Sequence, residues 1–294
     1  MDQLTHCPLC RSEVFRPFER HRKHHLVKCS SCSFVFITAI PSAEELHNLY
    51  CDYSYGEDQF VSPVTLKRYK EILEGFEPYR KHNRLLDVGC GNGQLLSVAR
   101  QMGWECLGLE VSPKAVEVCR LQGLTVLEGT LAERIEQLPQ CDVVVSVEVL
   151  EHLNTPGKEL AMMHDILRPG GLLYLTTPNF NGLLRLITGQ DYALIGYPEH
   201  LCYFTPATLR LLVRNSGFEM KKMESTGFSI TGLEGLKAAR FHEPAAHHST
   251  DEKLRKEMEV NPVLGFFKWT SNFFLKLSGT GNSLKIWAVK PSKE

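Results

Sequence analysis

The sequence predicts an α/β protein in which a sheet of seven strands carries helices on both faces, with a small cysteine-rich module in front of it. Two observations lead to this prediction. Short apolar runs alternate with amphipathic segments from residue 84 to about 225, a pattern typical of a parallel sheet covered by helices. Ahead of them, two Cys-x-x-Cys pairs stand within the first 40 residues of the 294-residue chain. This length suits one large domain or two smaller ones.

Seven segments are expected to form the strands of this sheet. Five are short apolar runs that should lie parallel, at residues 84–89, 105–110, 124–128, 142–147 and 171–177. The segments between them carry apolar residues at helical spacing and predict the helices 94–102, 113–122, 131–138 and 157–168. A Thr205-Pro206 cap then starts a helix that ends at Gly217 and leads into a strand at 218–225. The last strand, 283–290, is expected to pair antiparallel at the edge of the sheet.

Composition divides the chain into three regions. Residues 1–40 contain both cysteine pairs, and residues 41–82 read as helices because proline and acidic residues are followed by apolar residues at helical spacing. Residues 83–294 form the α/β domain, with a less regular insertion at about 227–280. That insertion includes the aromatic stretch 263–277, which we expect to be buried as a lid or a dimer face. The alternative is a position on a membrane surface or over an apolar substrate.

The charge balance excludes one class of function. Lys+Arg 33 against Asp+Glu 34 gives a formal net charge of -1, so the molecule has no overall field that would hold nucleic acid or anionic lipid non-specifically. All apolar runs are shorter than the roughly 18 residues that span a bilayer, and residues 1–10 lack the basic-then-apolar pattern of a signal peptide. We expect a cytoplasmic protein without stable membrane insertion.

A glycine-rich turn follows the first expected strand, in the sequence Leu-Asp-Val-Gly-Cys-Gly-Asn-Gly of residues 86–93. Glycines let a backbone approach a ligand closely, and the free N–H groups at the start of the following helix face that ligand. Glu110 closes the second strand, 23 residues after Asp87, where a carboxylate accepts hydrogen bonds from both hydroxyls of a ribose. The two features together predict a nucleoside-type cofactor.

The spacing of the glycines argues against an NAD-binding domain, which requires Gly-x-Gly-x-x-Gly. Counted from Gly89 the sixth position is Gln94, and counted from Gly91 it is Leu96, so the spacing here is Gly-x-Gly-x-Gly. Asp87, just before the glycines, also suits a cation rather than a pyrophosphate. The turn therefore favours S-adenosylmethionine, whose sulfonium and amino groups are positively charged.

A second set of polar residues follows the fourth strand, where open α/β sheets bind their ligands. On a helical turn Glu148, Glu151 and His152 would share one face, and His200, after the fifth strand, would add a ligand from the opposite wall. The expected catalytic residues are Glu151, His152 and His200. Three interpretations stay open: a divalent ion, Mg²⁺ or Mn²⁺, that lowers the pKa of a substrate hydroxyl; a metal-free general base, His152 or His200; and a structural network.

The two cysteine pairs, Cys7 with Cys10 and Cys29 with Cys32, are separated by 18 residues. This spacing predicts a zinc ribbon with a Cys₄ site, in which the metal supplies the folding energy that so short a segment lacks. A redox pair and free thiols are the alternatives. Between the pairs, the basic stretch 16–25 would contact phosphates of an RNA, a nucleotide sugar or a lipid-linked substrate, or form a solvated face. No set of base-reading aromatic residues favours RNA.

Four segments together resemble the successive motifs of class I S-adenosylmethionine-dependent methyltransferases: 85–93, 107–113, 141–153 and 167–179. The nearest likeness is to the O-methyltransferases of ubiquinone biosynthesis, through Val-Glu-Val-Leu-Glu-His-Leu after the fourth strand and Leu-Arg-Pro-Gly-Gly-Leu-Leu-Tyr-Leu-Thr-Thr-Pro-Asn into the fifth. Glu-x-x-Glu-His with a later histidine is also similar to the metal site of the small-RNA 2′-O-methyltransferases. The resemblance implies a Rossmann-like, seven-stranded methyltransferase sheet, with residues 41–82 folding over the cofactor as a helical lid.

The resemblance also implies roles for individual residues. The methionine part of the cofactor would be cradled by the aspartate and the glycines of the turn, Asp87, Gly89, Gly91 and Gly93. Glu110 would hold the ribose, and the adenine would lie against Val111 and the loop at Thr130 and Leu131.

The expected reaction is methyl transfer from S-adenosylmethionine to an acceptor atom, favoured as a hydroxyl, of a small or carrier-linked metabolite. A sugar hydroxyl is the leading acceptor, because the sequence resembles zinc-ribbon methyltransferases, and these belong to sugar, polysaccharide and secondary-metabolite pathways. The alternative is a nucleic-acid or protein-binding module that uses the zinc ribbon, with the methyltransferase fold as a cofactor-sensing scaffold. Nucleic acid is the less favoured partner.

Overall fold

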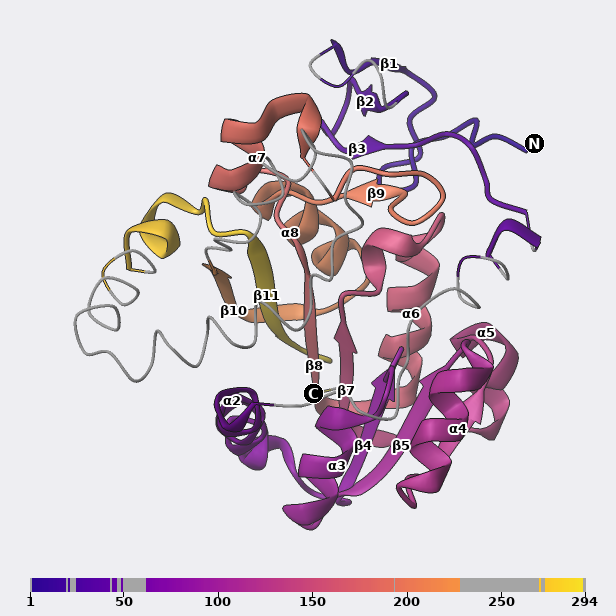
Figure 1. Ribbon diagram of the computed structural model, residues 1–294, viewed down its shortest axis with the longest axis vertical. Coiled ribbons are helices and arrows are strands. Elements are labelled where there is room, and N and C mark those ends of the chain that lie inside the picture. Colours follow the sequence, from indigo (N-terminus) through magenta and orange to yellow (C-terminus); the bar gives the residue numbers. More distant parts are fainter. Residues whose placement is uncertain are drawn as a thin grey trace.

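The computed structural model of the chain describes residues 2–19, 21, 25–42, 44–46, 49, 62–192, 194–227, 270 and 273–292. Two sheets make up the fold, a large one covered by helices and a small one near the N-terminus (Figure 1). No helix in these ranges is both long and apolar enough to cross a bilayer. Parts of the expected lid, of the insertion, of the aromatic stretch 263–277 and of the basic stretch 16–25 lie outside the described residues.

The large sheet has seven strands in the order β10-β11-β8-β7-β4-β5-β6, which confirms the predicted fold class. Its strands are β4 (Arg84–Val88), β5 (Glu105–Glu110), β6 (Val126–Glu128), β7 (Cys141–Val147), β8 (Leu167–Pro178), β10 (Glu219–Thr226) and β11 (Ser283–Val289). The first five of these are parallel. The chain runs from β4 outward to β6 and then returns to β7 on the other side of β4. The carboxyl ends of β4 and β7 therefore border the point where the strand order reverses, which is where open α/β sheets bind ligands.

The last strand lies at a different place from the one predicted. β11 pairs antiparallel with β8 on one side and with β10 on the other, so β10 forms the edge of the sheet. The prediction of an edge position was wrong because apolar alternation does not show whether a strand has one neighbour or two. Leu284, Ile286 and Ala288 of β11 are fully buried, as an interior strand requires.

Alternating side chains of the parallel strands pack against helices on opposite faces of the sheet. The helices are α2 (Pro63–Glu74), α3 (Gln94–Gln101), α4 (Pro113–Leu121), α5 (Leu131–Arg134), α6 (Pro156–Ile166), α7 (Leu183–Thr188) and α8 (Pro206–Asn215). Leu85 and Val143 belong to one buried cluster with side chains of α2, α3 and α4. Leu86 and Val144 belong to a second cluster with α5, α6 and α8. Each such buried side chain contributes roughly 1.5–3 kcal/mol to the stability of the sheet.

Side-chain caps explain where several helices begin. Ser62, Ser112 and Thr205 each accept a hydrogen bond from a backbone N–H of the first turn, and each is followed directly by proline. The segment 131–138 differs from the single helix that was predicted, because it divides into α5 and a 3-10 turn, Ile135–Gln137.

The small sheet joins the N-terminal region to the α/β domain. Its four antiparallel strands are, in order, β1 (Phe15–Pro17), β2 (Val27–Cys29), β3 (Val35–Phe36) and β9 (Cys202–Tyr203). Three strands come from the N-terminal region, and β9 comes from the segment after β8 (Figure 1). Cys7, Cys29, Phe34 and Phe36 also belong to the same buried cluster as side chains of the large sheet. The cysteine module and the α/β domain therefore share both a sheet and a core.

Candidate active site

The glycine turn lies between the carboxyl end of β4 and the start of α3. Gly89, Gly91 and Gly93 have φ angles of 73°, 52° and 69°, in the left-handed region that glycine adopts without strain. A Cβ added to Gly89 would lie 2.6 Å from Cγ2 of Val149, and one added to Gly93 would lie 2.4 Å from Cδ1 of Leu124. At these two positions glycine is therefore required by packing as well as by the backbone conformation.

Glu110 connects the end of β5 to this turn. Its buried carboxylate accepts hydrogen bonds from the backbone N–H groups of Gly91 (2.8 Å), Val111 (2.8 Å) and Ser112 (2.9 Å). The carboxylate is thus held beside the middle glycine, although β4 and β5 are separate strands. Ribose hydroxyls donate hydrogen bonds to a carboxylate at the end of the second strand, so the geometry suits the predicted role.

Asp87 lies near the end of β4 and is 4% exposed. Burial and, after it, the negative charge of Glu110 raise the pKa of the Asp87 carboxyl to about 7. A cation beside two such carboxyl groups favours their ionised forms. The buried acids and the narrow glycine turn therefore fit a ligand that combines a positive charge with a ribose, as S-adenosylmethionine does.

The residues predicted to flank the adenine lie around the end of β5 and the start of α5. The N–H of Gly129 donates to the carbonyl oxygen of Glu110 (2.9 Å), which brings the loop before α5 against β5. Thr130 caps α5 through reciprocal hydrogen bonds with the third residue of that helix. Leu131 is fully buried in the main core. Val111 and Thr130 thus lie near Glu110, the Leu131 side chain packs in the core, and contact with an adenine stays a prediction for all three.

Glu151, His152 and His200 form a compact group after the carboxyl end of β7, which we call the trio. One ligand atom from each residue, a carboxylate oxygen or a ring nitrogen, lies within 4.8 Å of the other two. Glu151 and His152 lie in a 3-10 turn, Leu150–His152, and His200 precedes β9. The two imidazole rings meet edge to face, with centroids 4.8 Å apart. The structure therefore brings together candidates from two distant segments.

The helical face expected for these residues is absent. The turn after β7 starts at Leu150, and Glu148 precedes it with a left-handed φ of 54°. The helical prediction was wrong because the N–H of Glu148 donates to the carbonyl oxygen of Thr176 (3.0 Å) in the neighbouring strand, and the left-handed backbone at Glu148 then separates it from the turn that starts at Leu150. The Glu148 carboxyl accepts hydrogen bonds from Oγ1 of Thr176 (2.7 Å) and Oγ of Ser283 (3.5 Å). It also shares a hydrogen bond with the carboxyl group of Glu151, so it borders the trio without being one of its three members.

Backbone carbonyl groups orient both imidazole rings of the trio. Nδ1–H of His152 donates to the carbonyl oxygen of Glu199 (2.7 Å), and Nδ1–H of His200 donates to that of Leu194 (2.7 Å). Because a carbonyl oxygen only accepts, each Nδ1 carries a proton, and in the neutral form of either ring the lone pair is therefore on Nε2. Burial and then the neighbouring His200 lower the pKa of His152 to about 4, so this ring is neutral near pH 7. The two Nε2 atoms can therefore act as bases or as metal ligands.

Hydroxyl groups at the end of β8 hold the two carboxyl groups beside the histidines. Oγ1 of Thr177 donates to Glu151 (2.9 Å), as Thr176 does to Glu148. Burial raises the pKa of Glu148, and burial together with the charge of Glu148 raises the pKa of Glu151. A divalent cation would favour the ionised forms of both, so this donor set fits one. Sequence reasoning missed the two threonines, although adjacent hydroxyl residues at the end of an apolar strand were a visible signal.

The four cysteines of the N-terminal region form a second cluster. Sγ of Cys7 lies 3.6 Å from Sγ of Cys32, Sγ of Cys10 lies 3.5 Å from Sγ of Cys29, and all four sulfur atoms lie within 4.8 Å of one another. Tetrahedral zinc with bonds of about 2.3 Å places its sulfur ligands about 3.8 Å apart, so the cluster fits a zinc ion. The hydrogen bond between Cys7 and Cys32 lowers the pKa of the Cys7 thiol and raises that of the Cys32 thiol, and a bound metal ion would stabilise the thiolate forms of all four.

The two cysteine pairs share one backbone geometry. The N–H of Arg11 donates to the carbonyl oxygen of Cys7 (3.0 Å), and the N–H of Ser33 donates to that of Cys29 (3.1 Å). Arg11 and Ser33 both have a left-handed backbone, with φ angles of 62° and 63°. Two matching tight turns that face each other are the arrangement of a zinc ribbon rather than of a redox pair at a strand–helix junction.

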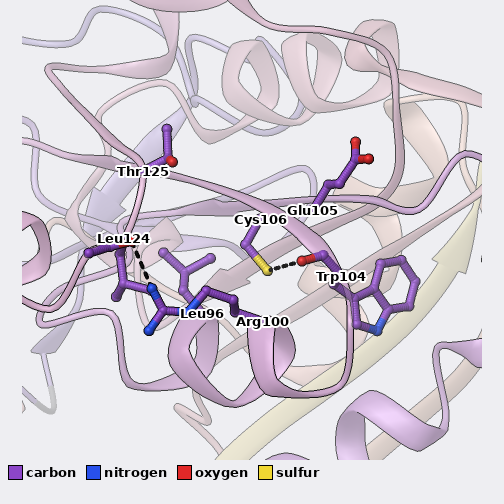
Figure 2. A pocket seen from close by; sticks show the side chains of 8 residues that line it. Leu96, Arg100, Trp104, Glu105, Cys106, Leu124 and Thr125 are labelled. Carbon is purple, nitrogen blue, oxygen red and sulfur yellow. Dashed lines mark hydrogen bonds between the residues drawn. The ribbon is translucent and has the colours of Figure 1, made fainter.

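A hollow of about 280 Å³ lies at the amino ends of β5 and β6, away from the carboxyl ends that border the candidate site (Figure 2). Glu105 begins β5 there, Thr125 immediately precedes β6, and Arg100 lies in the last turn of α3. The lining contains none of the predicted site residues, which gather at the other ends of these strands. The hollow is therefore separate from the candidate active site.

The strand order, the antiparallel β11 beside β8 and the nucleoside-type turn at the reversal point define a methyltransferase of class I. A family model described as a methyltransferase domain matches residues 55–222, more than half of the chain. The chain belongs to this family and is an S-adenosylmethionine-dependent methyltransferase. Family membership thus confirms an enzyme and favours it over a cofactor-sensing scaffold.

Curated relatives agree with this assignment, and solved structures share the fold. The ubiquinone biosynthesis O-methyltransferase of Methylococcus capsulatus is 32% identical over 184 residues, 55% of this chain and 78% of that protein. The protein of the same name from Aeromonas salmonicida is 28% identical over 198 residues, 63% of this chain and 76% of that protein. A SAM-dependent methyltransferase from Archaeoglobus fulgidus shares the fold with a TM-score of 0.51 at 20% identity, covering 76% of this chain and 94% of that one. For magnesium protoporphyrin IX methyltransferase from Synechocystis, solved with bound SAH, the TM-score is 0.53 at 13% identity, covering 85% and 100%.

Proposed function

We propose that this enzyme transfers a methyl group to a hydroxyl of a small or carrier-linked metabolite, with sugar hydroxyls as the first acceptors to test. The observation that carries the proposal is the trio, in which two Nε2 lone pairs lie beside a buried carboxyl group after β7. Such a group can remove the proton of a hydroxyl or, with a bound metal ion, lower the pKa of that hydroxyl. Relatives named as O-methyltransferases support the same acceptor atom.

The first half of the site holds the cofactor. S-adenosylmethionine supplies the methyl group on a sulfonium that already reacts with nucleophiles. Ionised Asp87 offsets its positive charge, Glu110 accepts hydrogen bonds from its ribose, and the glycine turn leaves room for its methionine part. Val111 and Thr130 flank its adenine. Held by these residues, the cofactor would present its methyl group to the acceptor oxygen, and such positioning provides most of the acceleration of an in-line displacement.

The trio acts on the acceptor. As the carbon–sulfur bond breaks and the carbon–oxygen bond forms, the hydroxyl proton leaves towards an Nε2 atom or towards solvent. The ring orientation favours metal ligation, because metal-binding histidines donate their other N–H to a carbonyl or carboxylate oxygen. Glu151, His152 and His200 would hold a Mg²⁺ or Mn²⁺ ion, with Glu148 beside them, and that ion would lower the pKa of an acceptor hydroxyl.

Removal of divalent ions distinguishes metal assistance from metal-free base catalysis. Chelation should lower methyl transfer at least about tenfold and leave the affinity for S-adenosylhomocysteine unchanged in calorimetry. Zinc analysis of the same sample is the control that the cysteine cluster is intact. Equal activity in chelator would instead show that Nε2 of a histidine removes the proton of the acceptor hydroxyl without a metal ion.

The acceptor atom is tested with methyl-labelled S-adenosylmethionine and a panel of sugars, nucleotide sugars and catechols. We expect the label in a methyl ether, and no transfer to analogues whose hydroxyl is blocked. Label found only on nitrogen or carbon would contradict the proposal.

We also propose one structural zinc ion at Cys7, Cys10, Cys29 and Cys32. Atomic absorption should find one zinc per chain, and Cys10→Ala should lower that content to the background. Full zinc content in this variant would refute the site. The reduced thiols of such a site are maintained in the cytoplasm, the compartment in which we expect this enzyme.

A further inference from the structure

The small sheet connects the cysteine cluster to the segment that carries His200. β3 pairs antiparallel with β9, and Phe36 lies opposite Cys202. One residue further along, the N–H of Ile37 donates to the carbonyl oxygen of Leu201 (2.9 Å). Figure 1 shows β3 and β9 side by side, between the N-terminal strands and the large sheet. We call this pairing the seam.

The main chain next to the seam contacts every member of the trio. The N–H of Leu201 donates to the carbonyl oxygen of Glu151 (2.7 Å). The carbonyl oxygen of Glu199 accepts the Nδ1 proton of His152, and His200 lies between these two positions in the chain. The place of residues 199–201 therefore determines how the three side chains meet.

On its other side, the seam continues directly into the second cysteine pair. The N–H of Cys29 donates to the carbonyl oxygen of Phe34 (2.9 Å) and closes the turn between β2 and β3. The ring of Phe34 packs on Phe204, just after β9, with centroids 5.1 Å apart. Cys29, Phe34 and Phe204 are all at most 1% exposed. A continuous set of buried contacts thus leads from a zinc-ligand candidate to the trio.

We infer that the four-cysteine module is a positioning element of the active site: it holds β3, and β3 fixes β9 so that His200 stays beside Glu151 and His152. The inference rests on the role proposed above for the trio. β9 has two residues, and within the described ranges β3 is its only ladder partner, whereas so short a strand does not persist alone. The strands β1 and β2 have three residues each and β3 has two. Their geometry therefore depends on the cluster, where bound zinc supplies folding energy.

Two independent changes test this inference in the full-length protein. Ile37→Pro removes the N–H that bonds to Leu201 across the seam, while all four cysteines remain. Ile40→Pro is the matched control, because the N–H of Ile40 bonds to the carbonyl oxygen of Asp2 instead. Cys10→Ala removes a zinc ligand and leaves every residue of the seam in place.

Four properties are measured: zinc content, the affinity for S-adenosylhomocysteine, the affinity for Mn²⁺ by electron paramagnetic resonance, and the ring ¹⁵N signals of His200 by NMR. Ile37→Pro should keep its zinc and its S-adenosylhomocysteine affinity within about twofold. It should bind Mn²⁺ at least about tenfold more weakly and lose the Nδ1–H pattern of His200. Cys10→Ala should lose zinc and show the same two changes, and Ile40→Pro should match the unmodified protein.

The inference is overturned if zinc-free protein that still binds S-adenosylhomocysteine keeps its Mn²⁺ affinity and its His200 signals. It is also overturned if Cys10→Ala loses S-adenosylhomocysteine binding, since the module would then support the whole domain. Failure of the proposed function is a different result: His200→Ala would leave Mn²⁺ binding and methyl transfer unchanged. The His200 signals of the other variants would still report whether the module positions the ring.

Discussion

The two halves of the candidate active site are built in different ways. The cofactor half comes from residues 84–131 and is held mainly by backbone groups, such as the N–H of Gly91 that donates to Glu110. The acceptor half combines residues 148–152 and 199–203 with hydroxyl groups of β8, and the N-terminal module is bonded to it through β3. The first half comes from one continuous stretch of the chain, whereas the second combines stretches that lie far apart in the sequence. The two halves should therefore respond separately to mutation.

The largest effect is expected for Glu151→Gln, which replaces the carboxyl group of the trio by an amide that can neither take up a proton nor carry the charge that a metal ion would favour. Methyl transfer should fall about 100- to 1000-fold, while the affinity for S-adenosylhomocysteine stays within about twofold. Single-turnover transfer of labelled methyl and calorimetry measure the two quantities. Glu159→Gln is the matched control, because burial raises the pKa of Glu159 to about 7 but its side chain lies on α6, outside the trio. Equal losses of transfer in both variants would show that the trio has no special role.

A smaller effect is expected for Glu110→Ala, and it should concern cofactor binding rather than methyl transfer. The affinity for S-adenosylhomocysteine should fall about 10- to 100-fold, because hydrogen bonds to a charged group contribute about 1.5–3 kcal/mol. Single-turnover transfer at saturating cofactor should change much less. Glu128→Ala is the control, since Glu128 lies opposite Glu110 at the end of the next strand and is exposed. The separation of the two halves fails if Glu110→Ala lowers transfer at saturation as strongly as it weakens binding.

The cofactor half should also respond to pH through Asp87. With a pKa of about 7, its carboxyl group is mainly neutral at pH 6 and mainly ionised at pH 8. Because the ionised form attracts a sulfonium, the affinity for S-adenosylmethionine should fall about tenfold from pH 8 to pH 6. Calorimetry at pH 6, 7 and 8 measures this change. A tenfold fall that persists in Asp87→Asn would assign it to another group.

The smallest effect is expected at the hollow beside the amino ends of β5 and β6. Arg100→Ala removes hydrogen bonds to the carbonyl oxygens of Gln122 and Gly123 and touches neither half of the site. Cofactor affinity and methyl transfer should both stay within about twofold of the unmodified enzyme. A loss of more than tenfold in either quantity would mean that this hollow communicates with the site.

Most of the large sheet could be predicted because its signals are local. Apolar runs mark the parallel strands, and Ser112 and Thr205 mark helix starts by satisfying N–H groups within one turn. The position of β11 could not be predicted in this way. Its alternation shows that it is a strand, but its place between β8 and β10 depends on which edges the rest of the chain leaves open.

The acceptor half was predictable in its residues but not in its geometry. Glu151, His152 and His200 stand out by residue type, yet their meeting requires the 3-10 turn after β7 and the pairing of β9 with β3. The groups that orient the rings are the carbonyl oxygens of Glu199 and Leu194. Every residue has such an oxygen, so no sequence pattern distinguishes these two.

The order of strands and helices along the chain, the left-handed glycine turn and the tight turn of each cysteine pair follow from the amino-acid sequence itself, because each depends on backbone preferences and side chains within a few residues. The facing of the two pairs does not, since it joins Cys7 to Cys32 and Cys10 to Cys29, which are 25 and 19 residues apart. The meeting of the two histidines with Glu151, the hydroxyl partners of the acids and the attachment of the cysteine module to β9 were decided by the tertiary structure. These features bring together residues that lie between 26 positions apart, for Glu151 and Thr177, and 168 positions apart, for Val35 and Tyr203, and the burial that holds them is not directional. Only the complete packing of the core selects which of those distant groups touch.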